Sequence, residues 1–345
     1  MPCEGELTVS DELIDPDNDD HVRLSVDDAQ ALGEQALVSL GFTAEHARIT
    51  ALHLVDAALS GYDFAGLPRI LIMADRPEMK EPCTPITIVK ETPVSALVDG
   101  GNHVGYIAIS HAANIGVEKA RTSGIGLICM RNSWFGGRAT HYLEKISRAG
   151  FAAIYAVSST PTVVPPGAMQ KALGTNPLAF ALPGKPDPFI FDMGTSSVMS
   201  GEVLMKAFFG EDFSEVCGID KQGEPTRNAS AMLEGGVFPF GGHKGYGLSL
   251  AVQALGLLAG SRFRNGDVTD FGYFIMVFDP ALFMPAEQFE EELAELIAKI
   301  KGLPKQPGIE EIRIPSERGF REREIRRKQG VLLSKRVHER LLEMT

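Results

Sequence analysis

The sequence contains no run of 18 consecutive apolar residues, which is about the length that a membrane-spanning helix needs. Its longest apolar segment, residues 246–260, is shorter and carries Ser249 and Gln253, so it predicts a buried helix. The N-terminus also lacks the basic and apolar stretches of a secretion signal. We therefore expect a soluble protein that does not contact membranes.

Cysteine is scarce and scattered. The four residues Cys3, Cys83, Cys129 and Cys217 form no C-x-x-C pair. This spacing argues against a disulfide framework and against a zinc knuckle, and it fits a reducing compartment. We expect a cytoplasmic protein without a metal site.

The common signatures of nucleotide-binding and hydrolytic enzymes are also absent. The sequence has no G-x-G-x-x-G after a strand, no G-x-x-x-x-G-K-[ST], no H-E-x-x-H and no G-x-S-x-G. If the chain binds a dinucleotide, it must do so without the usual glycine-rich fingerprint.

The formal net charge of −12 comes mostly from the first residues. Residues 1–20 contain eight acidic residues and no Lys or Arg, and without them the net charge is −4. The pattern predicts a flexible acidic tail over residues 1–20 and a nearly neutral body. Such a body does not indicate a nucleic-acid-binding protein.

Hydrophobic periodicity predicts alternating helices and strands after residue 20. Ser25 and Thr43 are candidate N-caps of two helices that end at Gly41 and Gly61. We expect further helices at 107–122, 142–149, 245–258 and 286–301, and strands at 86–99, 125–130, 152–158, 178–182, 188–192 and 271–278. We also expect a Gly-Gly-Asn turn at 100–102, a loop at 211–229 and a charged helical tail over the last 25 residues. Helices at both ends of a β-rich centre suggest that the termini pack together.

Several segments combine glycine with side chains that can bind anions. LGTNP at 173–177 and DMGTS at 192–196 place hydroxyls beside glycine, although both could be ordinary turns. GGHKGYG at 241–247 opens a helix with Lys244 near its positive end, which suits a phosphate, or is simply a glycine-rich helix start. RIPSER at 313–318 and GYDFAGLPR at 61–69 supply arginines for bidentate contacts, or are a solvated helix and a turn.

Together these segments resemble the type 2 malate/L-lactate dehydrogenase family over residues 22–343. The likeness is strongest in LGTNP, in FDMGTS at 191–196, in EGGVFPFGGHKGYGLS at 234–249 and in IPSERGFRERE at 314–324. Within the family, the Δ1-piperideine-2-carboxylate/Δ1-pyrroline-2-carboxylate reductases look closest. They share an acidic residue at the position of Glu202 and the ending S/G-E-R-x-x-R-E-R-E.

The resemblance implies an α/β fold with a non-Rossmann NAD(P)-binding domain, in which a mostly antiparallel sheet packs with a helical domain from both termini. The helical domain would comprise residues 21–80 and 302–345, and the NAD(P)-binding and substrate domain residues 81–301. The resemblance also implies a homodimer with its active site near the subunit interface, a small carboxylate substrate, and NADP or NAD as cofactor.

The same resemblance assigns the site residues by their match to the family motifs. Glu202 would be the catalytic residue, and the substrate would contact Arg69, Thr175, Ser200 and Gly201. The cofactor would contact a loop of Phe135, Gly136, Gly137, Arg138 and Ala139; then Asp192, Met193 and Gly194; then His243 and Lys244; and finally Arg313, Pro315, Ser316, Glu317, Arg318 and Gly319.

The chain departs from the family at its proton donor. The family pattern G-x-x-S-H-G-x-x-R has Phe64 and Ala65 in place of the Ser-His pair here, and N-S-x-H-F-G reads NSWFGG at 132–137. Reducing a ketone requires an acid that protonates the developing alkoxide, whereas a protonated imine needs no proton transfer in the hydride step. The loss of the histidines therefore favours an imine substrate.

We therefore expect an NAD(P)H-dependent reductase of a small cyclic or N-substituted 2-imino carboxylate that yields an amino acid. Arg69 would hold the substrate carboxylate and Glu202 would stabilise the iminium cation. One alternative is a 2-hydroxy acid dehydrogenase acting on 2-oxo acids, with Glu202 or a nearby residue as the acid: Tyr106, His103, His141 or Tyr142. Another is a catalytically silent homologue that binds a dinucleotide or a metabolite, against which the retained anion-binding residues argue.

Overall fold

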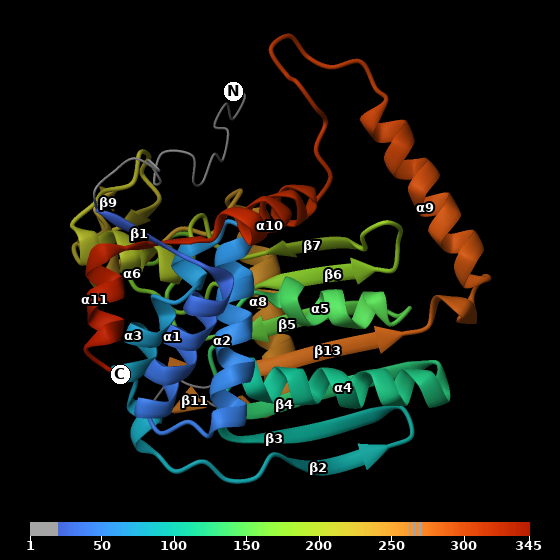
Figure 1. Ribbon diagram of the computed structural model, residues 1–345, viewed down its shortest axis with the longest axis horizontal. Helices are drawn as coiled ribbons and strands as arrows, with labels where there is room; N and C mark the ends of the chain where they lie inside the picture. The colour runs from blue at the N-terminus through green and yellow to red at the C-terminus, as the bar shows by residue number, and fades with distance from the viewer. Residues whose placement is uncertain (1–19, 262, 265–266, 269–270) are drawn as a thin grey trace. The chain divides into compact units, whose positions relative to one another are not determined.

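The computed structural model describes residues 20–261, 263–264, 267–268 and 271–345 (Figure 1). The tail expected over residues 1–20 lies outside the described residues except for Asp20. The chain divides into two compact units. We call them the terminal unit, which runs to Arg76 and includes Arg318–Thr345, and the central unit, Pro77–Glu317. None of the described helices is both long and apolar enough to cross a membrane.

The terminal unit is built from helices and one small sheet whose strands come from opposite ends of the chain. β1 (His21–Leu24) pairs antiparallel with β14 (Val331–Ser334), with His21 opposite Ser334. This pairing confirms that the two terminal regions pack together. The remaining elements of this unit are α1 (Val26–Ser39), α2 (Ala44–Leu59), the 3-10 turn η1 (Asp63–Ala65), α3 (Arg69–Ala74), most of α10 (Glu317–Gln329) and α11 (Lys335–Leu342).

The first two helices begin where the capping residues predict. The Ser25 hydroxyl accepts the Asp28 N–H at 3.1 Å, and the Thr43 hydroxyl accepts the His46 N–H at 3.2 Å. Such caps satisfy N–H groups that a helix start leaves without partners. The two helices then pack closely, because a Cβ at Gly33 in α1 would lie only 3.2 Å from the Ala51 side chain in α2.

The central unit is organised around a seven-stranded sheet of order β2-β3-β4-β13-β5-β6-β7. Neighbouring strands run antiparallel except β3 and β4, which are parallel. This confirms the expected α/β fold with a mostly antiparallel sheet. The strands are β2 (Thr87–Thr92), β3 (Ser95–Val104), β4 (Ile125–Trp134), β5 (Ala152–Ser158), β6 (Leu178–Leu182), β7 (Phe189–Met193) and β13 (Gly272–Phe278).

Helices cover both faces of this sheet (Figure 1). On one face lie α4 (Gly105–Ser123) and α5 (Ala139–Arg148), and on the other lies α8 (His243–Leu258). Glycines allow the close approach: a Cβ at Gly116 in α4 would lie 2.9 Å from Val277, and one at Gly256 in α8 would collide with Ser158. Val277 and Ser158 project from opposite faces, because side chains alternate along strands.

One edge of the sheet gathers the segments that carry the predicted site. At this edge lie the carboxyl ends of β3, β4, β5 and β7 and the amino ends of β6 and β13. The paired residues Val104–Trp134, Ser158–Gly272 and Leu178–Met193 show this. The loops attached to these strand ends are therefore close neighbours. We call this edge the site edge.

Three expectations about local structure are wrong. Residues 100–102 are not a turn but an irregularity inside β3, because the chain turns earlier, before Ser95. The last 25 residues are interrupted by β14. Residues 211–229 contain two short strands, β8 (Gly218–Ile219) and β9 (Pro225–Thr226), and the sequence reading missed α6 (Ser200–Phe209) entirely.

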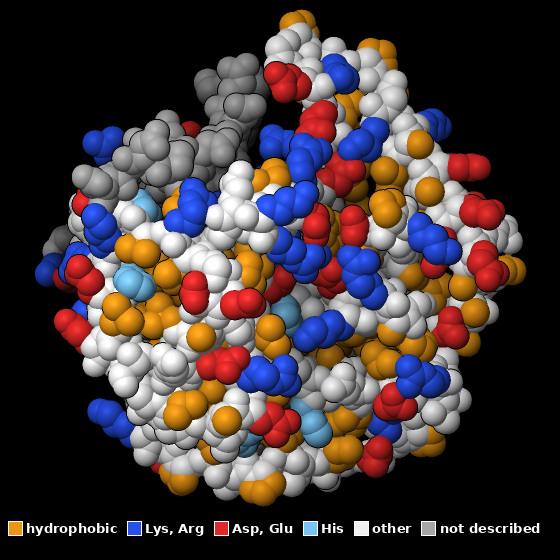
Figure 2. Space-filling model, viewed as in Figure 1, with side chains coloured by type: hydrophobic (Ala, Val, Ile, Leu, Met, Phe, Trp, Pro, Cys, Tyr) orange, Lys and Arg blue, Asp and Glu red, His pale blue; other side chains and the backbone are white. Residues whose placement is uncertain are grey.

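The central unit also contains shorter elements and one long helix outside the sheet. They are η2 (Pro77–Lys80), α7 (Ala229–Glu234), β10 (Gly236–Val237), β11 (Phe263–Arg264), β12 (Asp267–Val268), η3 (Pro280–Leu282) and α9 (Ala286–Lys301). Figure 2 shows acidic side chains along the outer side of α9 and hydrophobic ones beside them. No residue of α9 is buried by the described chain.

Candidate active site

The loop that follows β4 has an unusual backbone. Asn132, Phe135 and Gly137 have φ of 54°, 57° and 64°, in the left-handed region. A bulky side chain there is a true outlier and costs about 1–3 kcal/mol, so the surrounding structure must hold it. Two buried phenols do so: Tyr273 donates to the Phe135 carbonyl at 2.7 Å, and Tyr142 donates to the Gly136 carbonyl at 2.9 Å.

Asp192, at the end of β7, ties the other end of this loop to the sheet. Its carboxylate accepts both the N–H and the hydroxyl of Thr140, each at 3.0 Å, at the start of α5. Burial raises the pKa of the Asp192 carboxyl, while the bonds from Thr140 and the charge of Arg138 oppose the rise. Asp192 therefore acts as a cap for α5 and fixes Arg138 and Ala139 at the site edge.

Asn176 joins the LGTNP segment to α8 through buried hydrogen bonds. Its amide nitrogen donates to the Ser249 carbonyl and to the Gln253 side chain, both at 2.9 Å, and its oxygen accepts the Ser159 N–H at 3.0 Å. The neighbouring Thr175 carbonyl accepts the hydroxyl and the N–H of Thr195. These bonds hold LGTNP against DMGTS at the site edge, as the matching motifs imply.

Glu202 lies in the first turn of α6, directly after Ser200 and Gly201. Burial raises the pKa of its carboxyl, whereas the charge of Lys206 and a bond from the Met199 N–H lower it. That bond reaches back to the residue before the helix, as in a capping box. Glu202 thus has a structural role in α6, and its raised pKa also suits an acid.

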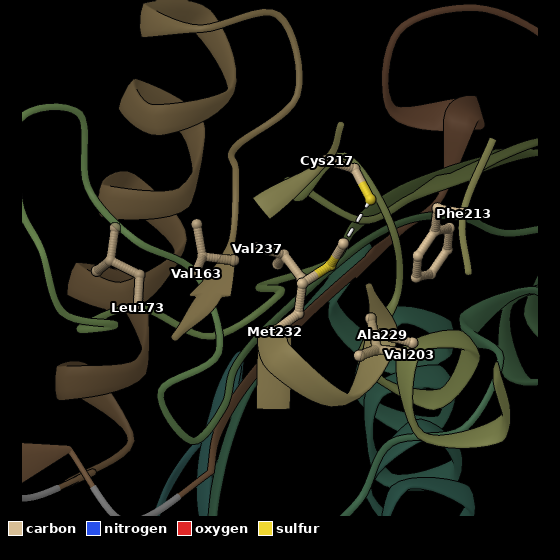
Figure 3. Close-up of a cluster of buried hydrophobic side chains, with 8 residues drawn as sticks. All are labelled: Val163, Leu173, Val203, Phe213, Cys217, Ala229, Met232 and Val237. Carbon is tan, nitrogen blue, oxygen red and sulfur yellow. Dashed lines mark hydrogen bonds between the residues drawn. The ribbon is translucent and has the colours of Figure 1, made fainter. Parts of the chain in front are cut away.

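A small apolar core fixes α6 in place. Figure 3 shows Val203 among the hydrophobic side chains that surround Met232, whose sulfur faces the Cys217 sulfur at 3.7 Å. Burial raises the pKa of Cys217 to about 11, and the charges of Glu202 and Glu215 add to the rise. The Glu202 carboxylate is therefore close enough to Cys217 for its charge to act on the thiol.

The start of α8 offers an open, positively charged surface. Gly241 and Gly242 have φ of 54° and 61°, and a Cβ on either would meet nothing within 4 Å. His243 and Lys244 follow as exposed residues at the helix N-terminus. Helix N–H groups, a lysine and unobstructed glycine backbone together fit a phosphate group.

The segment before α10 lies along the edge strand of the sheet. Ser316, with φ of 69°, donates its hydroxyl to the Ile190 carbonyl of β7 at 2.7 Å. Glu317 holds the segment by accepting from Lys301 at 2.6 Å and from the Ile314 N–H at 3.0 Å. Ser316 is thus bound to β7 two positions away from Asp192.

The terminal unit carries the rest of the predicted residues. Arg69 begins α3, and the Arg318 guanidinium lies over the Tyr62 ring at 5.1 Å. Arg326 fixes the intervening turn, because it donates to Asp63 at 2.7 Å and to the Ala58 carbonyl at 2.8 Å. Lys and Arg gather over α10 (Figure 2).

Phe64 and Ala65, in place of the family's Ser-His pair, lie in η1 of the same turn. Neither side chain can donate a proton. Of the alternative acids considered from sequence, Tyr106 and Tyr142 are fully buried and His141 contacts Lys145 at 3.0 Å. Burial also raises the pKa of Tyr142 far above its usual value. The two tyrosines are therefore structural, and Glu202, whose carboxyl pKa is raised, remains a candidate for the acid beside His103 and His141.

The sequence did not predict the residues that hold the predicted contact residues in place. Four residues that were not predicted as site residues do so through hydrogen bonds. They are Asn176, Thr195, Thr140 and Tyr273. Asn176 and Thr195 had a signal in the sequence, because Asn-Pro indicates a constrained turn and Thr195 lies in the DMGTS segment.

Comparison with known proteins agrees with this arrangement. The family model described as malate/L-lactate dehydrogenase matches residues 24–342. A malate dehydrogenase of Pyrococcus abyssi is 34% identical and covers 95% of each chain. The solved sulfolactate dehydrogenase of Methanocaldococcus jannaschii superposes with a TM-score of 0.81 at 31% identity, over 94% of this chain and 96% of that one.

The expected closeness to the imino acid reductases receives less support. The Δ1-pyrroline-2-carboxylate/Δ1-piperideine-2-carboxylate reductase of Pseudomonas putida is also 34% identical, but over only 72% of this chain and 74% of its own. Malate and sulfolactate dehydrogenases match more of the sequence. On these grounds the chain belongs to the malate/L-lactate dehydrogenase family of NAD(P)-dependent oxidoreductases.

Proposed function

We propose that the protein interconverts a small 2-hydroxy acid and its 2-oxo acid, with NADP or NAD as cofactor. The observation that carries this proposal is the match to a malate dehydrogenase over 95% of both chains. It differs from the function favoured by the sequence motifs alone, which was the reduction of a 2-imino acid.

Each of the following residues has its own role in this reaction. Arg69 binds the substrate carboxylate through the two parallel N–H groups of its guanidinium. Glu202 protonates the developing alkoxide during reduction, because its raised pKa keeps a larger protonated fraction available. Thr175, Ser200 and Gly201 line the substrate position. The bound nicotinamide supplies or accepts the hydride.

For the cofactor we propose the contacts that the resemblance assigns. The open glycines before α8, with His243 and Lys244, would hold phosphate, and the fixed loop 135–139 would contact the dinucleotide beside Asp192, Met193 and Gly194. The segment of Arg313, Pro315, Ser316 and Glu317, with Arg318 and Gly319, would complete the contacts. The glycines, the positive charge and the helix start of this region all suit an anionic dinucleotide.

Reduction of a small 2-imino carboxylate is the second candidate, and one observation favours it. Phe64 and Ala65 occupy the turn where the family has its proton donor, and a protonated imine needs no donor in the hydride step. In that reaction Glu202 would act as a carboxylate beside the iminium cation. Introducing Phe64→Ser and Ala65→His together should then create activity on 2-oxo acids.

The two candidates predict opposite pH dependence. If Glu202 is the acid, kcat/KM for 2-oxo acids without added amine falls as pH rises through its raised pKa, because the active form is protonated. If Glu202 stabilises an iminium cation, activity falls as pH drops through the same pKa. The change of NAD(P)H absorbance with time measures the activity in both cases. Glu202→Gln should lower kcat and remove the change of activity with pH that Glu202 causes.

The outcomes of this assay separate the proposals. Turnover of a cyclic imino acid without turnover of 2-oxo acids would reject the dehydrogenase in favour of the reductase. Binding of NAD(P)H without turnover of either substrate class would identify a catalytically silent homologue.

We also propose that the protein is a homodimer that forms through the outer face of α8. Leu248, Leu250, Leu257 and Leu258 on this helix are 36%, 49%, 45% and 66% exposed. Gly247 on the same helix has open space where a Cβ would stand, so another backbone can approach closely. A contiguous exposed apolar surface of this kind is typical of a protein interface, and a second copy is the occupant that the family resemblance implies.

Light scattering tests the dimer. The parent should have about twice the 37.3 kDa mass of one chain. Leu250→Glu with Leu258→Glu should yield the monomer, because two charges would be buried without partners. Phe283→Glu, at a residue 83% exposed outside α8, is the control and should leave the mass unchanged. A monomeric parent contradicts the proposal.

A further inference from the structure

Two tyrosine hydroxyls donate hydrogen bonds to consecutive carbonyl groups of loop 135–139 at the site edge. Tyr273 comes from β13 and donates to the Phe135 carbonyl at 2.7 Å; Tyr142 comes from α5 and donates to the Gly136 carbonyl at 2.9 Å. Both side chains are buried, at 0% and 2% exposed. The two bonds thus originate from separate elements and fix two neighbouring peptide groups.

These bonds determine where the next two N–H groups point. In a trans peptide the carbonyl and the N–H of the following residue point in opposite directions. The Gly136 N–H therefore points away from Tyr273, and the Gly137 N–H points away from Tyr142. Within the described part of the chain, neither N–H has a hydrogen-bond partner.

The loop also lies too close to the start of α4 and to β5 to move easily toward either of them. A Cβ on Gly105 would collide with the Phe135 carbonyl, and one on Gly136 would lie 3.0 Å from the Tyr155 hydroxyl. The left-handed conformation of Phe135 and Gly137 leaves few alternatives for the backbone. The two N–H groups are thus held in one orientation before any ligand binds.

We propose that Tyr142 and Tyr273 are positioning residues for the cofactor: they aim the N–H groups of Gly136 and Gly137 at an acceptor oxygen of the bound dinucleotide. The inference rests on the proposed cofactor contact of loop 135–139 and adds the residues that prepare it. Neither tyrosine touches the cofactor or takes part in the hydride step.

A third phenol supplies a matched control. Tyr155 lies beneath the same loop and is 1% exposed, but among the described residues its hydroxyl has no hydrogen-bond partner. Tyr155→Phe removes the same oxygen atom from the same environment without breaking a bond to the loop. Any general effect of losing a buried hydroxyl should therefore appear in this variant as well.

Titration of NAD(P)H fluorescence tests the inference. Tyr142→Phe and Tyr273→Phe should each raise the Kd by about fivefold, as expected for losing one neutral hydrogen bond that orders the loop. Tyr155→Phe should leave the Kd within about twofold of the parent. At saturating cofactor, kcat should be unchanged in all three, because the acid and the substrate contacts remain.

NMR relaxation of the backbone amides in the absence of cofactor gives a second readout. The order parameters of the Gly136 and Gly137 amides should be lower in Tyr142→Phe and Tyr273→Phe than in Tyr155→Phe or the parent, because the loop is less firmly held. If both variants match Tyr155→Phe in Kd and in these order parameters, the inference is wrong. If one variant does not fold, the other decides, since each phenol holds its own carbonyl. A parent that fails to bind NAD(P)H would instead refute the proposed function.

Discussion

Replacing Arg69 with alanine should lower kcat/KM for the carboxylate substrate by about a thousandfold. A guanidinium that binds a carboxylate through two charge-assisted hydrogen bonds contributes about 1.5–3 kcal/mol per bond. A loss of about 4 kcal/mol lowers kcat/KM by about a thousandfold, because each factor of ten corresponds to about 1.4 kcal/mol. The effect should fall mainly on KM, because the bond to the carboxylate is present in the ground state and in the transition state alike.

Arg69→Lys refines this test, because it keeps the charge but removes the planar pair of N–H groups. It should recover part of the affinity and still leave KM raised by about tenfold or more. Arg327→Ala is a suitable control, since Arg327 belongs to the same unit, is 53% exposed and pairs only with Glu324 among the described residues. An unchanged KM in Arg69→Ala would show that another cation binds the substrate.

Replacing Asn176 with alanine should destabilise the protein by about 3–5 kcal/mol, because the substitution leaves the partly buried Ser159 N–H and the buried Gln253 oxygen without their partner. Each buried polar group left without a partner costs about 1–3 kcal/mol, and the removed amide adds a cavity. Urea unfolding monitored by fluorescence would measure the loss.

Asn228→Ala provides the comparison for this prediction. Asn228 also accepts a backbone N–H and donates to a side chain, Asp212 at 2.7 Å, but it caps α7 at the surface. Losing an exposed N-cap costs about 1 kcal/mol. Equal losses in the two variants would mean that the Asn176 network is no more important than a surface cap.

Features that depend on nearby residues could be predicted from the sequence. Ser25 and Thr43 each precede a helical pattern, so the start of α1 and of α2 follows from local hydrogen bonding. The strands at 152–158 and 178–182 have the bounds that their apolar pattern predicts. The family motifs likewise marked the segments that meet at the site edge.

Features that depend on distant partners could not be predicted in this way. The Gly-Gly-Asn segment looks like a turn, but pairing of His103 with Ser133 draws it into β3. Nothing near Tyr273 in sequence indicates that its hydroxyl holds Phe135, a residue 138 positions away. Glu202 was assigned from its match to an acidic residue of the family, but α6 was not recognised, so the capping bond from the Met199 N–H could not be predicted.

The pairing of β1 with β14 sets the order in which the protein can form during translation. His21 emerges from the ribosome well before its partner Ser334, which lies much further along the chain. The central unit, by contrast, is complete in sequence once Glu317 has been synthesised. Because domains generally fold as units as they emerge, the central unit can fold while α1 and α2 still await their strand partner. Synthesis of β14 is therefore the step that allows the terminal unit to close, and a chain cut before Val331 would leave β1 with an open edge.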